Sequence, residues 1–294
     1  MDQFPPDRPL LETVMETGRG FSTWTPYALF CGEKLLGNVS LMPLRIWVEG
    51  RFQEVMGIAS VATDPTCRRM GVARRLMDHC LAITDRQGLA GVLFTSLPRV
   101  YEPFGFCAVE QTYRAIAAER LRVAASTPQC AWNESLSGPM LGLLARIYRT
   151  ECPDYNGKVD RDAAYWEFYR TLLDASPPTE LLISFRGGQP SGYARCELES
   201  DRILVTELCA NPSDENTAEG LLAEIADRAS RRSADWVTLA LPPDHFVFRF
   251  FQNRAILPER EPEGFRRETF MARPAGGHTG VSLAGLQWSL ADKF

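Results

Sequence analysis

Four arginines cluster around one glycine at the point where a predicted strand is followed by a predicted helix. Arg68 and Arg69 precede Gly71, and Arg74 and Arg75 follow it. The start of a helix carries free backbone N–H groups and a partial positive charge, so a basic turn in this place can bind an anion, typically a phosphate. Four cations there are unfavourable by ~0.3–1 kcal/mol each unless an anion arrives. The alternative interpretation is a basic helix start that faces solvent.

The elements on either side of this turn would position it. The apolar residues of the preceding strand are Val55, Met56, Ile58, Val61 and Ala62. Asp64-Pro65 ends that strand, because proline cannot donate to a strand ladder and restricts the residue before it. Apolar residues then recur near the helical period at Val72, Leu76, Cys80 and Ile83. A strand over Gly91–Thr95 follows, and a strand–helix–strand unit of this length predicts a parallel pair with a right-handed crossover.

The composition is that of an ordinary globular protein, and the length favours two compact units. The chain has 294 residues, of which 45% are hydrophobic and 23% charged, with a net charge of -5. This acidic balance argues against general nucleic-acid binding, and no apolar run reaches the ~18 residues of a membrane span. The eight cysteines lie singly and only three histidines exist, so we expect no metal site. With no signal-peptide pattern after Met1, the expected location is the cytoplasm.

The remaining pattern predicts more strands and helices in both halves of the chain. In the first half we expect a short helix near Leu10–Glu16 and strands over 27–31, 35–42, 44–48, 52 onward and 108–116. Residues 124–129 are small and polar, as in a linker. In the second half we expect helices around 141–148, 165–169 and 218–230, and strands over 181–185, 192–198, 203–209 and 237–241. The second half therefore repeats the order of the first, and residues 286–290 could add an edge strand.

The motif Arg68-x-x-Gly71-x-Ala73 resembles the acyl-CoA pyrophosphate loop of GCN5-related N-acetyltransferases (GNATs), whose pattern is Gln/Arg-x-x-Gly-x-Gly/Ala. Val61-Ala62-Thr63-Asp64-Pro65 is similar to the strand that leads into that loop. Tyr101-Glu102-Pro103-Phe104-Gly105-Phe106 resembles the family's Tyr-Glu-Lys-x-Gly-Phe segment. The resemblance covers roughly residues 26–117. It implies an α/β (α+β) protein built from two tandem GNAT folds, with mixed central sheets flanked by helices.

The doubled order of elements is similar to the enhanced-intracellular-survival branch of these acetyltransferases. Members of that branch carry two such domains and a sterol-carrier-like domain, and they acetylate amines. This chain departs from the branch by ending about a domain earlier and by a beginning that looks short for the usual first strand and two helices. We expect a catalytic domain over residues 1–125, a degenerate GNAT-like domain over 126–275, and a tail over 276–294 that could reach the active site.

The resemblance also assigns residues to the acyl-CoA site. Backbone N–H groups from Arg69 to Arg74 would cradle the pyrophosphate, and Val61 to Thr63 would run beside the pantetheine arm as an added strand would. The full set is Val61, Ala62, Thr63, Arg68, Arg69, Met70, Gly71, Val72, Ala73, Arg74, Ser96 and Leu97. A backbone N–H in that strand could also hold the thioester carbonyl as negative charge develops on it. The alternative for Val61 to Thr63 is an ordinary internal strand.

Tyr101 is the predicted general acid, because a phenol with a pKa near 10 is protonated at pH 7 and can donate to the departing thiolate. Its alternative role is packing in an aromatic turn. Three groups are candidates for the general base: Glu54 on the strand entering the site, a chain of water molecules, and a terminal carboxylate on Phe294. The alternative for Phe294 is a frayed end. His79 is better explained as a solvent or core histidine.

The second half lacks the features of a cofactor loop. Where that loop would fall, the sequence reads Asn211-Pro212-Ser213-Asp214-Glu215-Asn216, with two carboxylates and no arginine or glycine. Two negative charges would repel a pyrophosphate. The position matching Tyr101 lies near Phe250-Phe251, which cannot protonate a thiolate. We therefore expect the second domain to complete the acceptor pocket or an oligomer interface.

Together these features predict an N-acetyltransferase that moves acetyl from acetyl-CoA, its cosubstrate, to a primary amine by direct attack. The alternative is a CoA-binding regulatory or scaffolding protein without turnover. The partner would be a small-molecule or peptide amine, with no nucleic acid and no membrane, and a homo-oligomer is compatible with the sequence. The acceptor should be positively charged, but the acidic residues are too scattered to name its pocket.

Overall fold

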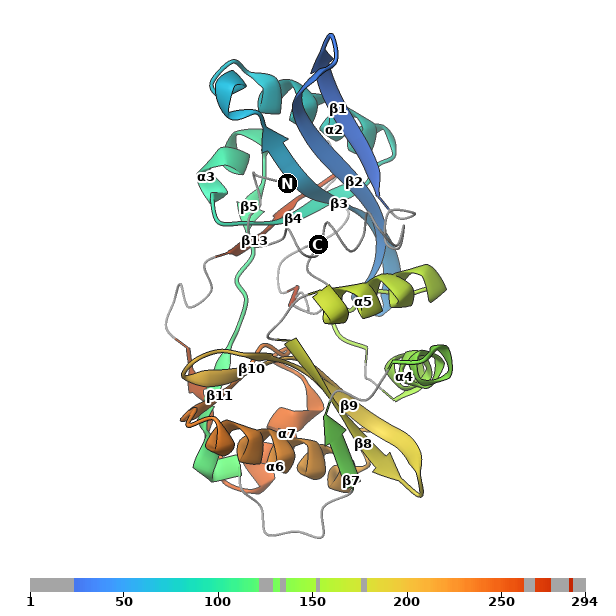
Figure 1. Ribbon diagram of the computed structural model, residues 1–294, viewed down its shortest axis with the longest axis vertical. Helices are drawn as coiled ribbons and strands as arrows, with labels where there is room; N and C mark the ends of the chain where they lie inside the picture. Colours follow the sequence, from blue (N-terminus) through green and yellow to red (C-terminus); the bar gives the residue numbers. More distant parts are fainter. Residues whose placement is uncertain are drawn as a thin grey trace.

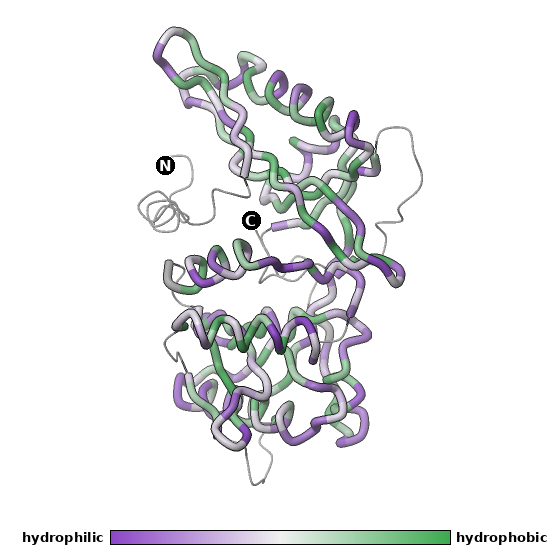
Figure 2. Tube along the Cα trace, turned by 90° about the vertical axis from the view of Figure 1, so that its right-hand side faces the viewer, coloured by the Kyte–Doolittle hydropathy of each residue, from purple (hydrophilic) through white to green (hydrophobic). Residues whose placement is uncertain are grey.

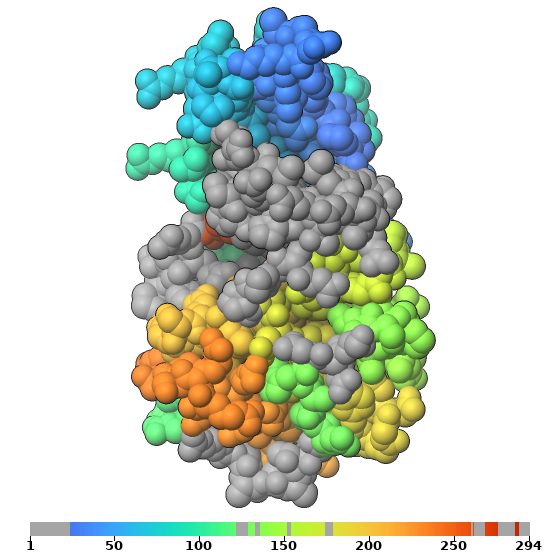
Figure 3. All heavy atoms as spheres, viewed as in Figure 1, coloured from blue at the N-terminus to red at the C-terminus, as the bar shows by residue number. Residues whose placement is uncertain are grey.

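The computed structural model describes residues 24–121, 129–132, 136–151, 154–175, 179–261, 268–275 and 286–287. The helix predicted near Leu10–Glu16, most of the predicted linker and the end of the tail, with Phe294, lie outside these ranges. Within them, two mixed sheets follow one another along the long axis of an elongated molecule (Figure 1). The space-filling view shows the first strands and α2 in blue at one end and α6 and α7 in orange toward the other (Figure 3).

The first sheet has, among the described residues, six strands in the order β1-β2-β3-β4-β13-β5. Their bounds are β1 Thr25–Cys31, β2 Lys34–Val48, β3 Arg51–Thr63, β4 Ala90–Thr95, β13 Thr269–Arg273 and β5 Cys107–Ala108. Helix α2 (Val72–Arg86) covers one face with its apolar stripe, as the sequence predicts. Three single turns border the sheet: η3 (Pro65–Cys67), α3 (Pro98–Tyr101) and η4 (Glu102–Phe104).

The second sheet has, among the described residues, seven strands in the order β12-β6-β11-β10-β9-β8-β7. Their bounds are β12 Glu259–Arg260, β6 Arg114–Ala117, β11 Trp236–Leu239, β10 Arg202–Ala210, β9 Gln189–Leu198, β8 Thr179–Arg186 and β7 Gln129–Trp132. Its helices are η5 Ala118–Leu121, α4 Gly138–Thr150, α5 Ala163–Ala175, α6 Glu215–Arg231 and α7 Phe246–Asn253. Apolar segments run through the sheets and helices, whereas polar segments lie at the turns (Figure 2).

The predicted internal repeat is confirmed by the pairing of the strands. In the first sheet, β1, β2 and β3 pair antiparallel and β4 joins β3 in parallel after α2. In the second sheet, β8, β9 and β10 pair antiparallel and β11 joins β10 in parallel after α6. Gly37 and Gly192 occupy matching places. A Cβ on Gly37 would lie 2.7 Å from Val72 in α2, and one on Gly192 would lie 2.6 Å from Thr217 in α6.

The two sheets exchange strands across the division predicted at residue 125. β6 lies before that residue but pairs antiparallel with β11 of the second sheet. β13 lies within the predicted second domain, yet it pairs with β4 and β5 of the first sheet. The single strand predicted over Ala108–Ile116 is therefore wrong, because residues 109–113 cross between the sheets. The pattern of a short strand does not show which sheet it joins when its partners are distant in sequence.

The first hairpin also differs from the prediction. The strands expected over 35–42 and 44–48 are one continuous strand, β2, which includes Pro43. β1 pairs with β2 only as far as Leu41, so the missing N–H of Pro43 costs no bond to β1. Two strands therefore precede β3, where three were expected. Leu286 and Gln287 lie in no strand, and the rest of the predicted edge strand is outside the described residues.

A segment of the second half is fixed to both sheets. Val159 packs with Met42 and Ile46 of β2, and the backbone N–H of Trp47 donates to the carbonyl of Lys158 over 2.7 Å. Two residues beyond Val159, the buried Arg161 forms an ion pair of 2.6 Å with Glu207 of β10. Because the partners lie in different sheets, this segment holds the two halves of the chain together.

Candidate active site

The turn around Gly71 leaves the start of α2 open. Gly71 is the N-cap residue and has φ +80, a left-handed conformation that favours glycine, and it offers no side chain as a cap. The first helical bond runs from the N–H of Arg75 to the carbonyl of Gly71 over 3.0 Å. The N–H groups of Val72 to Arg74 therefore have no acceptor within the helix. The first turn of α2, which is fully described, contains no acidic residue.

Arg69, two residues before Gly71, is also left-handed, with φ +64. This conformation is uncommon for a residue with a side chain and costs of order 1–3 kcal/mol, so the surrounding structure must hold it. Left-handed residues within a turn direct successive N–H groups into a concave anion site. Arg68, Arg69 and Met70 are exposed, so the concavity is open to solvent. The turn has the geometry of an anion site.

Strands β3 and β4 separate next to this turn. Their parallel pairing ends at Gly57 and Val92, after which β3 continues to Thr63 and β4 to Thr95. Val61, Ala62 and Thr63 are half-buried and lie on the part of β3 that no longer pairs with β4. An extended molecule inserted here can pair with an exposed strand edge. The separated ends of β3 and β4, here termed the slot, thus run toward the turns at Gly71 and Tyr101.

A bulge that the sequence did not predict lies within this slot. Ser60 has φ +51, and the β2–β3 register shifts between Asn38 and Ser40. The side-chain amide of Asn38 donates to the carbonyl of Ser60 over 3.2 Å and so supports the bulge. Bulges turn backbone groups out of the ladder and are common beside active sites. The sequence carries no clear signal of this bulge, because serine is not a residue type that commonly adopts the left-handed conformation.

Tyr101 closes the turn of α3 beside the end of β4. Its ring lies 6.3 Å from that of the buried Phe106, edge to face, and packs against the core under α2. Burial raises the pKa of Tyr101 above its usual value, and a hydrogen bond with Thr95 opposes part of that rise. The phenol is therefore protonated at neutral pH, as a general acid must be. Thr95 is the last residue of β4, so Tyr101 lies at the end of the separated strand.

The other predicted cofactor residues surround the same region. Leu97 is 63% exposed, and its N–H donates to Thr95 Oγ1 over 2.9 Å. Ser96 is exposed beside it, and the Val72 side chain is buried under the sheet, so Val72 can offer only its backbone. The Arg74 guanidinium lies 5.7 Å from the ring centre of Phe104, which joins the Gly71 turn to the turn that carries Tyr101.

Of the candidate bases, Glu54 lies away from this group. It is exposed on β3 next to Val55, which pairs with Ala90 at the start of β4. Ser60 lies six positions after Glu54 along the strand, which corresponds to about 20 Å. The structure therefore brings Tyr101 and the Gly71 turn together but leaves Glu54 at the far end of β3.

Phe294, whose terminal carboxylate is another candidate for the general base, is outside the described residues. The chain before it is fixed between the two halves. The side chain of Gln111 donates to the carbonyl of Leu286 over 2.8 Å, and the Thr112 N–H donates to Gln287 Oε1 over 2.8 Å. Leu286 is buried in the same cluster as Val92 of β4. Residue 287 is thus held between the halves, seven positions before Phe294.

The start of α6 in the second half is closed by its own residues. Asp214 caps the helix by accepting from the Thr217 N–H over 3.2 Å, and it forms an ion pair of 2.5 Å with Arg186. Burial alone would raise the pKa of Asp214, but the hydrogen bonds of Thr217 and the charge of Arg186 hold it below its usual value. An ionised carboxylate therefore occupies the place where α2 is open.

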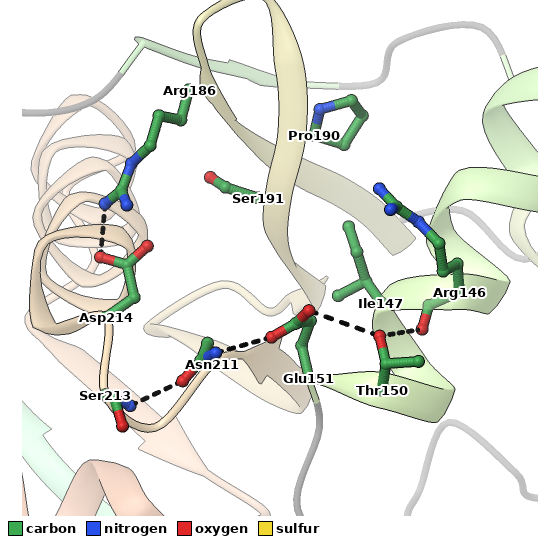
Figure 4. A pocket seen from close by; sticks show the side chains of 10 residues that line it. All are labelled: Arg146, Ile147, Thr150, Glu151, Arg186, Pro190, Ser191, Asn211, Ser213 and Asp214. Atoms are coloured by element: carbon green, nitrogen blue, oxygen red, sulfur yellow. Dashed lines mark hydrogen bonds and ion pairs between the residues drawn. The ribbon is translucent and has the colours of Figure 1, made fainter.

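A pocket of about 280 Å3 lies next to this capped start. Its side chains come from α4, from β8 and β9, and from the turn before α6 (Figure 4). Asn211 donates to Glu151 over 2.8 Å, and Arg186 forms an ion pair with Asp214. The polar side chains of the pocket are thus bonded to one another. The pocket lies far along the chain from Tyr101 and belongs to the second half.

No three His, Cys, Asp or Glu side chains within the described ranges are grouped to hold a metal ion. None of the helices described is long and apolar enough to cross a bilayer.

Comparison with known proteins agrees with the open turn and the separated strands. Residues 15–109 match the model of the acetyltransferase (GNAT) domain. This part of the chain is a GNAT domain. An uncharacterised N-acetyltransferase of Streptomyces coelicolor is 27% identical over 173 residues, which are 55% of this chain and 42% of that protein. The match therefore spans less than half of the relative's length.

Solved structures show the same fold over most of the chain, including the half after the GNAT domain. A protein of unknown function from Enterococcus faecalis, described as a probable N-acyltransferase, has a TM-score of 0.67 at 19% identity, covering 92% of this chain and 66% of its own. Eis1 of Mycobacterium abscessus has a TM-score of 0.58 at 18% identity, covering 85% and 64%. A tandem GNAT protein of the clavulanic acid pathway has a TM-score of 0.50 at 13% identity, covering 93% and 90%. The chain thus has two GNAT-like folds in tandem, as predicted.

Proposed function

We propose that the protein is an N-acetyltransferase that moves acetyl from acetyl-CoA to a primary amine by direct attack. GNAT domains generally use acetyl-CoA, and residues 15–109 form such a domain. The observation that carries the proposal is that the open start of α2 and the protonated Tyr101 both lie beside the separated ends of β3 and β4. A pyrophosphate fits the first feature, and a departing thiolate fits the second.

Each residue of the slot has a defined part in this reaction. The Gly71 turn binds the pyrophosphate through its N–H groups, and the exposed Arg68 and Arg69 add positive charge beside it. The backbone of β3 from Val61 to Thr63 pairs with the pantetheine arm and orients the thioester. An N–H at the bulge can hold the carbonyl oxygen as negative charge develops on it. Tyr101 then donates its proton to the thiolate that leaves.

The base in this proposal is water or a carboxylate from the tail rather than Glu54. The anchoring of Leu286 and Gln287 between the halves favours a contribution from the tail, because about seven extended residues span roughly 23 Å. The acceptor, a small-molecule or peptide amine, would then bind between the GNAT domain and the second fold. No disulfide joins any two of the seven cysteines that lie in the described ranges, which suits a reducing cytoplasm.

Changing Glu54 to glutamine tests the choice of base. We expect the variant to keep most of its turnover, because its carboxylate lies at the far end of β3 from Tyr101. Loss of a general base would instead lower kcat by ~10²-fold or more. Steady-state kinetics with saturating acetyl-CoA measures the difference. A loss of that size, with the folding of the variant unchanged, would make Glu54 the base.

The reaction itself is tested by thiol release from acetyl-CoA in the presence of a panel of amines. The panel should include polyamines, aminoglycoside-like amines, amino acids and short peptides. The proposal expects amine-dependent release of CoA and an acetylated product with at least one of them. Tight CoA binding without turnover on any amine would favour the alternative, a CoA-binding regulatory or scaffolding protein.

A further inference from the structure

Arg273 connects three parts of the GNAT domain from a strand that follows the second fold. It is the last residue of β13, which lies between β4 and β5 in the first sheet (Figure 1). Two of its guanidinium nitrogens donate to the carboxylate of Asp85 on α2, over 2.6 and 2.8 Å. Its third nitrogen, Nε, donates to the backbone carbonyl of Phe104 over 2.9 Å.

The Phe104 carbonyl belongs to the turn that carries Tyr101. The Phe106 N–H donates to the Tyr101 carbonyl over 3.4 Å, and the Gly105 N–H donates to the Glu102 carbonyl over 2.9 Å. Gly105 has φ +85. The Arg273 side chain lies against it, since a Cβ at Gly105 would stand 3.7 Å from Arg273 Nε. Arg273 thus contacts this turn at two successive residues.

The contacts of Arg273 are well suited to fix a position. Its side chain is only 16% exposed, and all three nitrogens of the planar fork are used at once. A bidentate pair with a carboxylate sets the orientation of the guanidinium, so the direction of Nε toward Phe104 is fixed as well. A lysine could pair with Asp85 but would lack the separate Nε donor.

We propose that Arg273 is a positioning residue for Tyr101 in the acyl transfer. The inference rests on the proposed function, and it explains how the half of the chain after the GNAT domain serves catalysis. The chain passes through the whole second fold before β13 enters the first sheet, and β13 then brings the donor that fixes the Tyr101 turn. The GNAT domain matched over residues 15–109 is therefore incomplete without a residue from the far side of the second fold.

A double-mutant cycle between Arg273→Lys and Tyr101→Phe tests this role. Alone, Arg273→Lys should lower kcat about tenfold and leave the Kd for CoA unchanged, because a small misplacement of a catalytic group costs up to ~10²-fold. In the Tyr101→Phe background the same change should have almost no further effect on kcat, because the group that it positions is gone. An unchanged kcat in the single variant, or equal losses in both backgrounds, would overturn the proposal.

Asp85→Asn is the matched control. It removes the charge beside Arg273 but keeps an acceptor for the guanidinium and leaves the bond to Phe104 in place. We expect a smaller fall in kcat than for Arg273→Lys, with thermal unfolding curves recorded for every variant. A larger fall for Asp85→Asn would assign the effect to α2 and contradict the proposal.

A second readout does not depend on turnover. The phenolate absorbance of Tyr101, taken as the difference between the wild-type protein and Tyr101→Phe, can be titrated with and without Arg273→Lys. Loosening the turn should expose the ring and move the pKa of Tyr101 back toward its usual value. If no amine is acetylated, the proposed function fails, and this titration still decides the inference, since an unmoved pKa would overturn it.

Discussion

Replacing Tyr101 with phenylalanine should lower kcat by about 10²-fold or more, because the thiolate would then leave without a proton donor. The change removes one oxygen and keeps the ring that packs beside Phe106, so the fold should be unaffected. The Kd for CoA should stay near that of the wild-type protein. Thiol release under saturating acetyl-CoA and amine measures kcat, and calorimetry measures the Kd.

The pH dependence of the wild-type reaction supplies a related check. Burial holds the pKa of Tyr101 above its usual value of about 10, so the phenol loses its proton only at a higher pH. The alkaline decline in kcat that belongs to Tyr101 should accordingly have its midpoint above pH 10 and be absent from Tyr101→Phe. Turnover that is unaffected by Tyr101→Phe would remove this residue from the mechanism.

Replacing Gly71 with aspartate should weaken CoA binding by about 30-fold or more. A carboxylate at the N-cap would copy the arrangement of Asp214 in α6 and place a negative charge near the pyrophosphate. At an effective dielectric constant near 40, two like charges about 4 Å apart cost roughly 2 kcal/mol, which corresponds to this factor. Calorimetric titration with CoA at low ionic strength measures the loss.

Gly71→Asn is the control for backbone strain. A Cβ at Gly71 would meet no atom within 4 Å, and the strain of placing a side chain at φ +80 is shared by both variants. Asparagine has the size of aspartate and tolerates the left-handed conformation, but it is neutral. The difference in Kd between the two variants therefore reports the charge. Equal affinities would contradict an anion site at this turn.

The parts of the site that were predictable are those set by local sequence. Arg68, Gly71 and the apolar spacing from Val72 predicted the turn and α2, because strand, turn and helix follow one another without interruption. The order of elements in the second half was predictable for the same reason. The two carboxylates of the Asn211–Asn216 stretch indicated that no pyrophosphate binds there, and the structure shows that one of them, Asp214, caps α6.

The parts that were missed depend on residues far apart in the chain. The bulge at Ser60 is held by Asn38 from another strand, and neither residue type signals it alone. β13 joins a sheet whose other strands lie more than 150 positions earlier, so its short apolar pattern could not show its place. The sequence assigned Glu54 to the strand that enters the site but could not show its register, and the structure places it on the paired part of β3, three positions before Gly57.

We propose that the chain holds one acyl-CoA site, at the Gly71 turn of the GNAT domain, and none at the start of α6. Calorimetric titration of the intact protein with CoA tests it most directly, because the stoichiometry counts sites without need of the acceptor amine. We expect one CoA to bind per chain in the wild-type protein, and we expect CoA binding to be lost or greatly weakened in Gly71→Asp. Two sites per chain, or one site whose affinity is the same in Gly71→Asp, would contradict it.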